Sequence, residues 1–255
     1  MKLRFYLFSV KQYLQNRSVC HQLKKFRNIH KGQRCFIIGT GPSLTTEDLE
    51  LLKDEVCFGS NRIFEIYPRT EWRPTYYINQ DYALLQKYVR EVNELTPRAM
   101  FLPIDVKPAF GSNPLAHFFV LRHKDYYPND ADFSQKLHHY LGQGFTVTYG
   151  AIQMARYMGF SEVYLLGIDH NYSISLNEKG IPVLNEGTQD YFQGSTASNK
   201  GLNLPRVVES TVAYMTARKF ADRHSDFAVY NATRGGKLEA FERVKLEDVL
   251  AGKDR

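Results

Sequence analysis

The chain has 255 residues, of which 43% are hydrophobic and 24% charged, and its formal net charge is +6. This composition is that of a globular domain with a full core and excludes a disordered chain, while three scattered cysteines exclude a disulfide framework or a zinc site. No apolar run approaches the roughly 20 residues that span a bilayer, and no nucleic-acid recognition motif occurs, so we expect a cytoplasmic protein that binds no nucleic acid.

The positive charge gathers at the start of the chain. Residues 1–34 hold nine Lys or Arg and no Asp or Glu, and we expect residues 1–33 to form a basic helical leader. Such a helix can lie on anionic lipid at the inner face of a membrane or approach an anionic acceptor, or it can pack by its apolar side and leave its charges in water. The sequence leaves both interpretations open.

From residue 35 onwards, short apolar runs alternate with amphipathic segments. We expect strands at 35–39, Val56–Ser60, Thr75–Ile78, Ala99–Leu102, Phe118–Leu121, Glu162–Leu166 and Phe227–Tyr230, and helices at Thr45–Leu52, Tyr82–Asn93, Val147–Met158 and Val207–Asp222. Residues 171–205 are long and polar, as in a lid over a binding site. The alternation predicts an α/β, Rossmann-like fold: a mostly parallel sheet with helices on both faces, in a single domain over residues 34–255.

Polar residues directly follow many of these strands. Parallel sheets bind ligands beyond the carboxyl ends of their strands. We therefore expect one shared cleft, lined by Thr40, Ser43, Asn61, Asn79, Asp81, Asp169, His170 and Asn231.

The segment Cys35–Leu44, CFIIGTGPSL, predicts a strand, a glycine turn and the start of a helix. Gly39 and Gly41 allow close approach of the backbone to a ligand, and Pro42 suits a helix start because it lacks an N–H. Ser43 adds a hydroxyl near free amides, an arrangement that binds anions. We expect this turn to hold the phosphate end of a nucleotide-type ligand, with a tight structural turn as the alternative; it is neither a P-loop nor a GxGxxG fingerprint.

Two strand ends carry side chains suited to a nucleotide. Asn61 can bind a base or ribose or cap a turn, and Arg62 can pair with phosphate in a bidentate fork. Asn79 has a similar character to Asn61. Asp81 can hold a ribose hydroxyl or a metal, although capping of the next helix is the simpler role.

Hydroxyl and titratable groups gather at two later positions. Thr146 and Thr148, in FTVTYG, can cap a helix or bind phosphate. Asp169, His170 and Tyr172 follow the strand EVYLL together, and each can act as a general acid or base. Neither a serine nucleophile elbow nor an HExxH zinc motif occurs, and we expect no metal site.

In this order, the motifs resemble the MptE-like family, named after an archaeal 6-hydroxymethylpterin diphosphokinase. The matching segments span roughly Cys35 to Val244 and read CFIIGTGPSL, SNRIF, YYINQDYAL, FTVTYGAIQMARYMGFSEVYLLGIDHNY and NATRGGKLEAFERV. Many members are similar to bacterial sialyltransferases that use CMP-sugars and to flagellin glycosyltransferases. The resemblance implies that Thr40, Gly41, Ser43 and Asn61 hold a nucleotide, that Thr148 and Gly150 face its phosphate and sugar, and that Asp169 and Tyr172 border the reacting centre.

One segment departs from the sialyltransferase pattern. Those enzymes place a histidine base in the long loop after Gly-Ile-Asp, where this chain has Gln189-Asp190-Tyr191-Phe192. The base is then Asp190, with His170 as the alternative, or the protein uses a different donor.

The resemblance implies a cytoplasmic glycosyltransferase of bacterial surface polysaccharide synthesis, for capsule or lipopolysaccharide. It would transfer a sugar from an activated donor, a CMP-sugar or else phosphoribosyl pyrophosphate, to a hydroxyl of a glycan or lipid-linked glycan, without metal or cofactor. Two alternatives stay open. One is a Mg²⁺-dependent pyrophosphokinase that acts on a pterin alcohol with ATP, with Asp81, Asp169 and Asp190 as a carboxylate cluster. The other is a non-catalytic nucleotide-binding partner.

Overall fold

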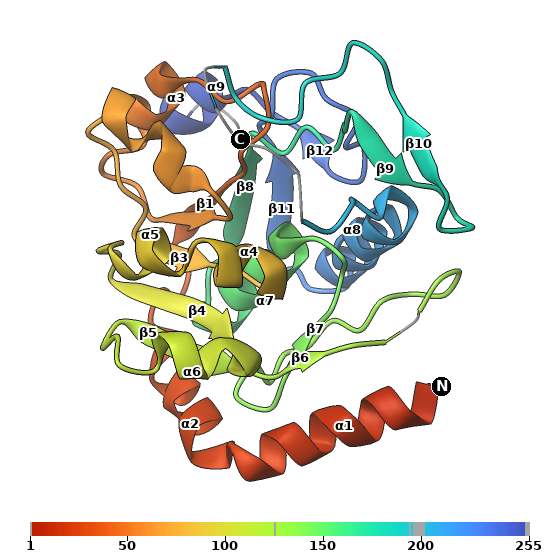
Figure 1. Cartoon of the computed structure of the whole chain (residues 1–255). Helices are drawn as coiled ribbons and strands as arrows, with labels where there is room; N and C mark the ends of the chain where they lie inside the picture. Colours follow the sequence, from red (N-terminus) through yellow and green to blue (C-terminus); the bar gives the residue numbers. More distant parts are fainter. Residues whose placement is uncertain (1, 125, 194, 196–201, 253–255) are drawn as a thin grey trace.

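A parallel β-sheet forms the centre of the molecule (Figure 1). The computed structural model describes residues 2–124, 126–193, 195 and 202–252. In this part of the chain the main sheet has eight strands in the order β12-β11-β8-β1-β2-β3-β4-β5, and every pair of neighbours runs parallel. These strands are β1 (Arg34–Ile38), β2 (Cys57–Ser60), β3 (Tyr76–Ile78), β4 (Ala99–Pro103), β5 (Ala116–Phe119), β8 (Glu162–Leu166), β11 (Ala228–Asn231) and β12 (Glu242–Arg243).

Helices cover both faces of this sheet. The α-helices are α1 (Lys2–Gln15), α2 (Arg17–His21), α3 (Thr46–Leu51), α4 (Tyr82–Lys87), α5 (Val89–Asn93), α6 (Lys107–Phe110), α7 (Val147–Met158), α8 (Val207–Asp222) and α9 (Leu246–Leu250). Short 3₁₀ turns occur at η1 (Gln22–Phe26), η2 (Ile63–Arg69) and η3 (Ile104–Val106). Helices α7 and α8 share one core with the sheet, and α3, α4, α5, α6 and α9 share the other.

Strand β1 shows why both faces are covered. Successive side chains of a strand point to opposite faces. Cys35 and Ile37 belong to the core under α7, while Phe36 and Ile38 belong to the core under α3, and all four are buried. A strand that is apolar on both faces is stable only in the middle layer, which confirms the predicted α/β, Rossmann-like, mostly parallel sheet.

Helices α7 and α8 begin and end at the predicted residues. Gly159 ends α7 in the left-handed conformation, with φ of 91°, which glycine adopts without steric cost. The predicted helix Tyr82–Asn93 is instead two short helices that meet at Tyr88. The predicted strand Phe118–Leu121 is also divided, because β5 ends at Phe119 and β6 (Leu121–Arg122) pairs with β7 (Leu141–Gly142) in a separate sheet.

The segment predicted as a polar lid contains regular structure. Strands β9 (Ile174–Leu176) and β10 (Pro182–Leu184) form an antiparallel hairpin. Residues 194 and 196–201 of the same segment lie outside the described residues. The expected structureless loop over 171–205 was therefore wrong for its first part, and whether the segment acts as a lid stays a prediction.

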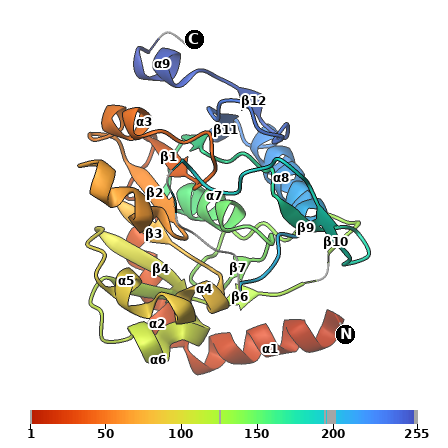
Figure 2. The same cartoon turned by 45° about the horizontal axis from the view of Figure 1, so that its top comes forward.

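The basic leader is helical over most of its length, in α1, α2 and η1, and turns follow from Arg27 to Gly32. Its second half joins the domain: Leu23 and Phe26 are buried in the core under α7, and α2 and η1 cover strand β5 at the edge of the sheet. Helix α1 lies across the bottom of the molecule in Figures 1 and 2. None of the helices in the described residues has the length and apolar character needed to cross a membrane.

Candidate functional site

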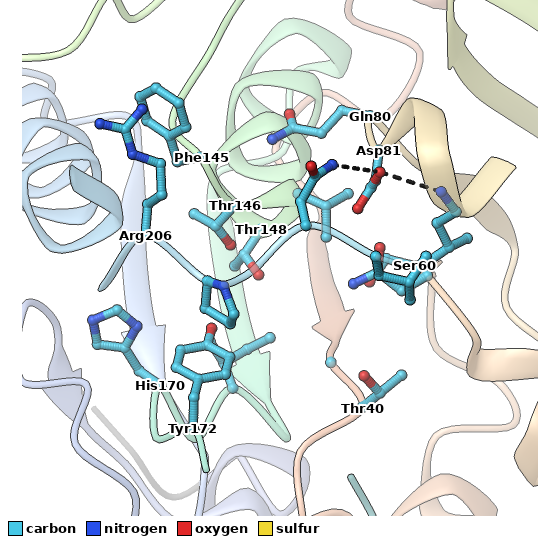
Figure 3. Close-up of a pocket in the computed structure, with 18 of the residues that line it drawn as sticks. Thr40, Ser60, Gln80, Asp81, Phe145, Thr146, Thr148, His170, Tyr172 and Arg206 are labelled. Atoms are coloured by element: carbon cyan, nitrogen blue, oxygen red, sulfur yellow. Dashed lines mark hydrogen bonds between the residues drawn. The ribbon is translucent and has the colours of Figure 1, made fainter. Parts of the chain in front are cut away.

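A cavity of about 590 Å³ opens beyond the carboxyl ends of β1, β2, β3 and β8. Figure 3 shows its side chains converging from these strand ends and from the starts of α7 and α8. Of the eight residues expected to share a cleft, five line it: Thr40, Asn61, Asp81, Asp169 and His170. The topological rule for parallel sheets thus predicted the position of this cavity.

The other three residues have structural roles. Ser43 donates from Oγ to Asp169 Oδ2 over 2.7 Å. Asn79 is fully buried, donates to the Tyr77 hydroxyl and accepts from the amide of Asp81. Asn231 is also buried and bonds within the segment that follows β11. The expectation that Ser43, Asn79 and Asn231 line the shared cleft was therefore wrong.

The glycines after β1 make room for another loop. A Cβ on Gly39 would lie 2.3 Å from the carbonyl oxygen of Gly167, and one on Gly41 would lie 1.9 Å from Asp169 Oδ2. Both backbone amides donate to carbonyls around the end of β8, Gly39 to Leu166 and Gly41 to Gly167. The turn forms one wall of the cavity, and its glycines are required because the Gly167 carbonyl and the Asp169 carboxylate approach them; a ligand held by the turn stays a prediction.

The protein's own groups occupy part of the start of α3. The helix begins at Thr46, where Thr45 and Asp48 form a reciprocal capping box, and Arg234 pairs with Asp48. Pro42 and Ser43 lie earlier, in a turn closed by a hydrogen bond from Leu44 to Gly41. The capping box satisfies the amides of Thr45 and Asp48, which leaves fewer amides for a phosphate, and the anion site at this turn stays a prediction.

Arg62 is buried at the edge of the cavity, with only 1% of its surface exposed. Its guanidinium lies 4.2 Å from the ring centroid of Tyr191 and 3.4 Å from the hydroxyl of Tyr88. A cation stacked on an aromatic face is held there by the ring's charge distribution. Arg62 therefore supports Tyr191 in the wall of the cavity, and its bidentate contact with a phosphate stays a prediction.

Asp81 caps the next helix, the simpler of the roles expected from its sequence. Its Oδ1 accepts from the amides of Ala83 and Leu84 at the start of α4, and Asn203 also donates to it. The same side chain lines the cavity opposite the start of α7 (Figure 3).

The N-terminus of α7 opens into the cavity. Phe145, Thr146, Val147 and Thr148 all line it, and the first turn of the helix contains no acidic residue. Thr146 occupies the capping position but makes no capping hydrogen bond, since its hydroxyl pairs with that of Tyr214 over 3.1 Å. The prediction that a threonine hydroxyl caps this helix was therefore wrong. The first-turn amides and the positive end of the helix dipole face the cavity without a side-chain cap, which favours a bound anion.

Gly150 lies two residues beyond Thr148, the last residue of α7 that lines the cavity. A Cβ there would approach Leu141 Cδ2 to 3.0 Å and Gln80 Oε1 to 3.1 Å. This glycine lets α7 pack closely against its neighbours, and the expected contact with a sugar is not supported.

Two titratable side chains lie at the end of β8. Asp169 accepts from Ser43 as described, and burial raises the pKa of its carboxyl above the ordinary value. His170 is 7% exposed, and burial lowers the pKa of its imidazole to about 4. Both groups are thus shifted toward their uncharged forms.

The hydrogen bonds of His170 define its tautomer. Its Nε2 lies 2.7 Å from the hydroxyl of Thr211, and that hydroxyl donates its single proton to the carbonyl of Val207. Nε2 must therefore carry a proton and donate to Thr211, which leaves Nδ1 as an acceptor. Nδ1 is buried and has no hydrogen-bond partner among the described residues. A neutral imidazole in this state can take a proton or accept a hydrogen bond from a ligand once a small movement of the side chains around it exposes the buried Nδ1.

Tyr172 completes this side of the site. Its ring centroid lies 6.1 Å from that of His170, in an edge-on arrangement. Burial among other tyrosines and carboxylates raises the pKa of its phenol, so the hydroxyl remains protonated and can donate a hydrogen bond.

Asp190 accepts hydrogen bonds from Ser173, the residue directly before hairpin β9–β10. Its Oδ1 accepts from the amide of Ser173 over 2.7 Å and its Oδ2 from the hydroxyl of Ser173 over 2.6 Å. The residues after it dock on the turn following β1, where Phe192 is buried and its amide donates to the carbonyl of Thr40. Asp190 thus lines the cavity while holding this segment in place.

Sequence reasoning missed many of the lining residues, among them Phe145, Tyr191, Arg206 and Tyr214. Arg206 stacks its guanidinium 4.2 Å from the ring centroid of Phe145 and pairs with Glu209. Its position directly before a predicted helix was a usable signal. No sequence signal marks Tyr214 as a cavity residue, because an aromatic residue inside an amphipathic helix normally belongs to the core.

Carboxylates do not gather for a metal in the described residues, where no group of three His, Cys, Asp or Glu could hold an ion. The tripeptide Asp130–Ala131–Asp132 has the Asp-x-Asp spacing of some metal sites. In the structure Asp130 pairs with Lys219 and Asp132 with Arg122, and neither lines the cavity.

Two solved structures resemble this fold. The MAf glycosyltransferase from Magnetospirillum magneticum AMB-1 superposes with a TM-score of 0.54 and 16% identity, over 92% of this chain and 41% of that one. The sialyltransferase CstII from Campylobacter jejuni, solved with cytidine-5'-monophosphate, gives a TM-score of 0.49 and 16% identity, over 84% and 85% of the two chains. At this identity the likeness to MAf is one of fold, and this chain spans less than half of that protein's length.

No curated protein matches the chain in sequence. A family model does match, over residues 9–175, and its description is 6-hydroxymethylpterin diphosphokinase MptE-like. The match includes the glycine turn, the start of α7 and the end of β8, which carry the resemblance noted in the sequence. Because it covers more than half of the residues, the chain belongs to the MptE-like family.

Proposed function

We propose that this protein is a glycosyltransferase that moves a sugar from an activated phosphate donor to a hydroxyl of a glycan acceptor. The observation that carries the proposal is the uncapped N-terminus of α7 facing the cavity, with the neutral imidazole of His170 on the wall beside it. The N-terminus of α7 suits a phosphate that gains negative charge as it leaves the sugar. The imidazole of His170 suits removal of a proton from the acceptor hydroxyl. The fold shared with the MAf glycosyltransferase agrees with this proposal.

The phosphate of the donor would lie against the first turn of α7. The amides there and the hydroxyls of Thr148 and Tyr172 are donors in a partly water-free site, and Tyr214 orients the hydroxyl of Thr146. Fixed donors of this kind stabilise developing negative charge without reorganising. The nucleoside would extend toward the strand ends at Thr40, Ser60, Asn61 and Gln80.

His170 is the better candidate for the base. Both oxygens of Asp190 already accept hydrogen bonds from Ser173, whereas Nδ1 of His170 is an acceptor without a partner among the described residues. In the proposed step the acceptor hydroxyl oxygen bonds to the anomeric carbon. The bond from that carbon to the donor phosphate breaks, and its electron pair leaves with the phosphate. The hydroxyl proton passes to Nδ1, whose pKa rises when the negative donor is bound nearby.

The finer assignment follows the resemblance stated from the sequence. A CMP-sugar is the favoured donor and phosphoribosyl pyrophosphate the second, without a required metal. The acceptor would be a glycan or lipid-linked glycan of a bacterial surface polysaccharide, extended in the cytoplasm.

A second function is suggested by the family's description as a diphosphokinase. A pyrophosphokinase would need Mg²⁺ and converging carboxylates. Asp81 caps α4, Asp169 is held by Ser43 and Asp190 by Ser173, and these three do not form a metal-binding group. The geometry therefore favours sugar transfer.

A thermal-shift panel tests the proposal with CMP, CDP, UDP, ATP and phosphoribosyl pyrophosphate, each with and without Mg²⁺. We expect CMP or CDP to stabilise the protein without metal. Thr148→Val should weaken that binding about tenfold, since a hydrogen bond to a charged group contributes ~1.5–3 kcal/mol. The matched control is Thr46→Val, which removes a hydroxyl at the start of α3, away from the cavity.

If ATP with Mg²⁺ were the only combination that stabilised the protein, a pyrophosphokinase would be the better assignment. Binding of CMP without sugar transfer to any of a wide set of acceptors would favour a non-catalytic partner.

A further inference from the structure

Helix α1 exposes three large apolar side chains to solvent. Leu7, Phe8 and Leu14 are 55%, 50% and 64% exposed, whereas Ser9 on the opposite side of the helix is buried. At 100° per residue, Leu7 and Leu14 lie on one stripe with Lys11 between them, and Phe8 borders it. A helix that packs on a globular domain normally buries its apolar stripe, so this arrangement is inverted.

Polar and aromatic contacts hold α1 in this orientation. Gln12 donates to the carboxylate of Asp105, and the Tyr13 hydroxyl lies 3.0 Å from Nε2 of His21. The guanidinium of Arg122 lies 5.2 Å from the ring centroid of Tyr6. These contacts fix the inward side of the helix, and the described part of the chain does not cover the outward side.

The charged residues of this N-terminal segment have one sign. Lys11, Arg17, Lys24, Lys25 and Lys31 are exposed, and no Asp or Glu precedes Glu47 in the sequence. A second copy of the chain would bring two such basic segments together, which is unfavourable. The exposed apolar side chains and the basic residues together match a partner with dense negative charge above an apolar layer. An anionic lipid bilayer has this structure.

We propose that α1 docks this protein on anionic membranes, lying in the plane of the surface. Leu7, Phe8 and Leu14 enter the boundary between head groups and acyl chains, and the lysines and Arg17 lie among the lipid phosphates. Helix α1 contacts β6, whose Leu121 also lines the cavity. Docking therefore brings one wall of the cavity close to the bilayer.

Vesicle co-sedimentation of the full chain tests this, with phosphatidylcholine alone and with an equal mixture of phosphatidylcholine and phosphatidylglycerol. We expect binding to the anionic vesicles only, and weaker binding at high salt. The double variant Leu7→Gln, Leu14→Gln should lower the partition coefficient at least about tenfold, because each leucine loses its transfer into an apolar layer. Lys11→Gln should lower it about fivefold.

The matched control is Leu184→Gln, which removes an equally exposed leucine, 67% accessible, from strand β10 on the hairpin. It should leave vesicle binding unchanged. All variants alter exposed side chains, so circular dichroism and the melting temperature should stay those of the parent protein. Equal binding to neutral and anionic vesicles, or unchanged binding by the double leucine variant, overturns the proposal.

Light scattering tests self-association. A dimer that dissociates in the double leucine variant, without vesicle binding by the parent, would make the face an interface between copies and overturn the lipid assignment. The thermal shift with soluble nucleotides does not depend on α1, so failure here is distinguishable from failure of the proposed glycosyltransferase activity.

Discussion

At the scale of single residues, His170 carries the largest expected effect on turnover. Its backbone is left-handed, with φ of 50°, a conformation that asparagine tolerates. His170→Asn should therefore fold, while removing the acceptor nitrogen. We expect kcat with an identified donor and acceptor to fall at least about 100-fold, the usual contribution of a general base. The thermal shift with CMP should persist, because the phosphate contacts on α7 are intact.

Asp190→Asn supplies the comparison. Its oxygen can still accept from Ser173, so the segment should stay docked and turnover should change little if His170 is the base. Loss of turnover in Asp190→Asn with normal activity in His170→Asn would reverse the two assignments.

The position of a residue in the cavity could be predicted from sequence where the topology of the parallel sheet alone determines it. Asn61 and Asp169 directly follow strands, and their place in the cavity follows from the parallel sheet. The roles of Gly39 and Arg62 could not be predicted, because their partners, Gly167 and Tyr191, are more than 100 residues away in sequence. Hydrogen bonding to such distant groups decides whether a polar side chain is available to a ligand.

At the scale of elements, the segment after β10 is anchored at Phe192. This side chain is 1% exposed in the core that contains α3, and Arg69 lies 5.1 Å from its ring centroid. Phe192→Ala removes most of that buried area, and local opening should then need less free energy than global unfolding. We expect limited proteolysis within residues 185–193 to speed up about tenfold, with a melting temperature close to that of the parent.

Leu184→Ala is the control, because that side chain is exposed and anchors nothing in the described structure. Equal protease sensitivity in Phe192→Ala and the parent would show that the anchor lies elsewhere. If the segment also acts as a lid, Phe192→Ala should raise KM for the donor.

Whether a helix or strand could be predicted depended on how clearly its sequence pattern marks it. Helix α7 was predicted to the residue because its apolar positions recur at helical spacing and Gly159 ends it. The break at Tyr88 between α4 and α5 was missed because the helical pattern continues across it. The break follows from tertiary contact, since the Tyr88 ring and hydroxyl meet Arg62. Hairpin β9–β10 was missed because β10 is exposed and lacks the alternation of a half-buried strand.

At the scale of the whole molecule, buried histidines should make the fold sensitive to acid. Burial lowers the pKa of His170 to about 4 and that of His117 to about 4, against 6.5 in an unfolded chain. Above pH 6.5 both states are uncharged and these groups have no effect. As the pH falls from 6.5 to 4, the unfolded chain takes up protons that the folded protein does not, so stability decreases.

For His170, a shift of this size corresponds to roughly 3 kcal/mol of lost stability by pH 4. Asp169 acts in the opposite sense, because its raised pKa lets the folded protein bind that proton first. Urea unfolding at a series of pH values between 7 and 4 measures the sum. We expect the free energy of unfolding to fall through this range, and the decline to be shallower in His170→Asn, which has no imidazole to protonate. Parallel pH profiles for the variant and the parent would mean that His170 is already solvated in the folded protein, and the neutral base assigned to it would then fail as well.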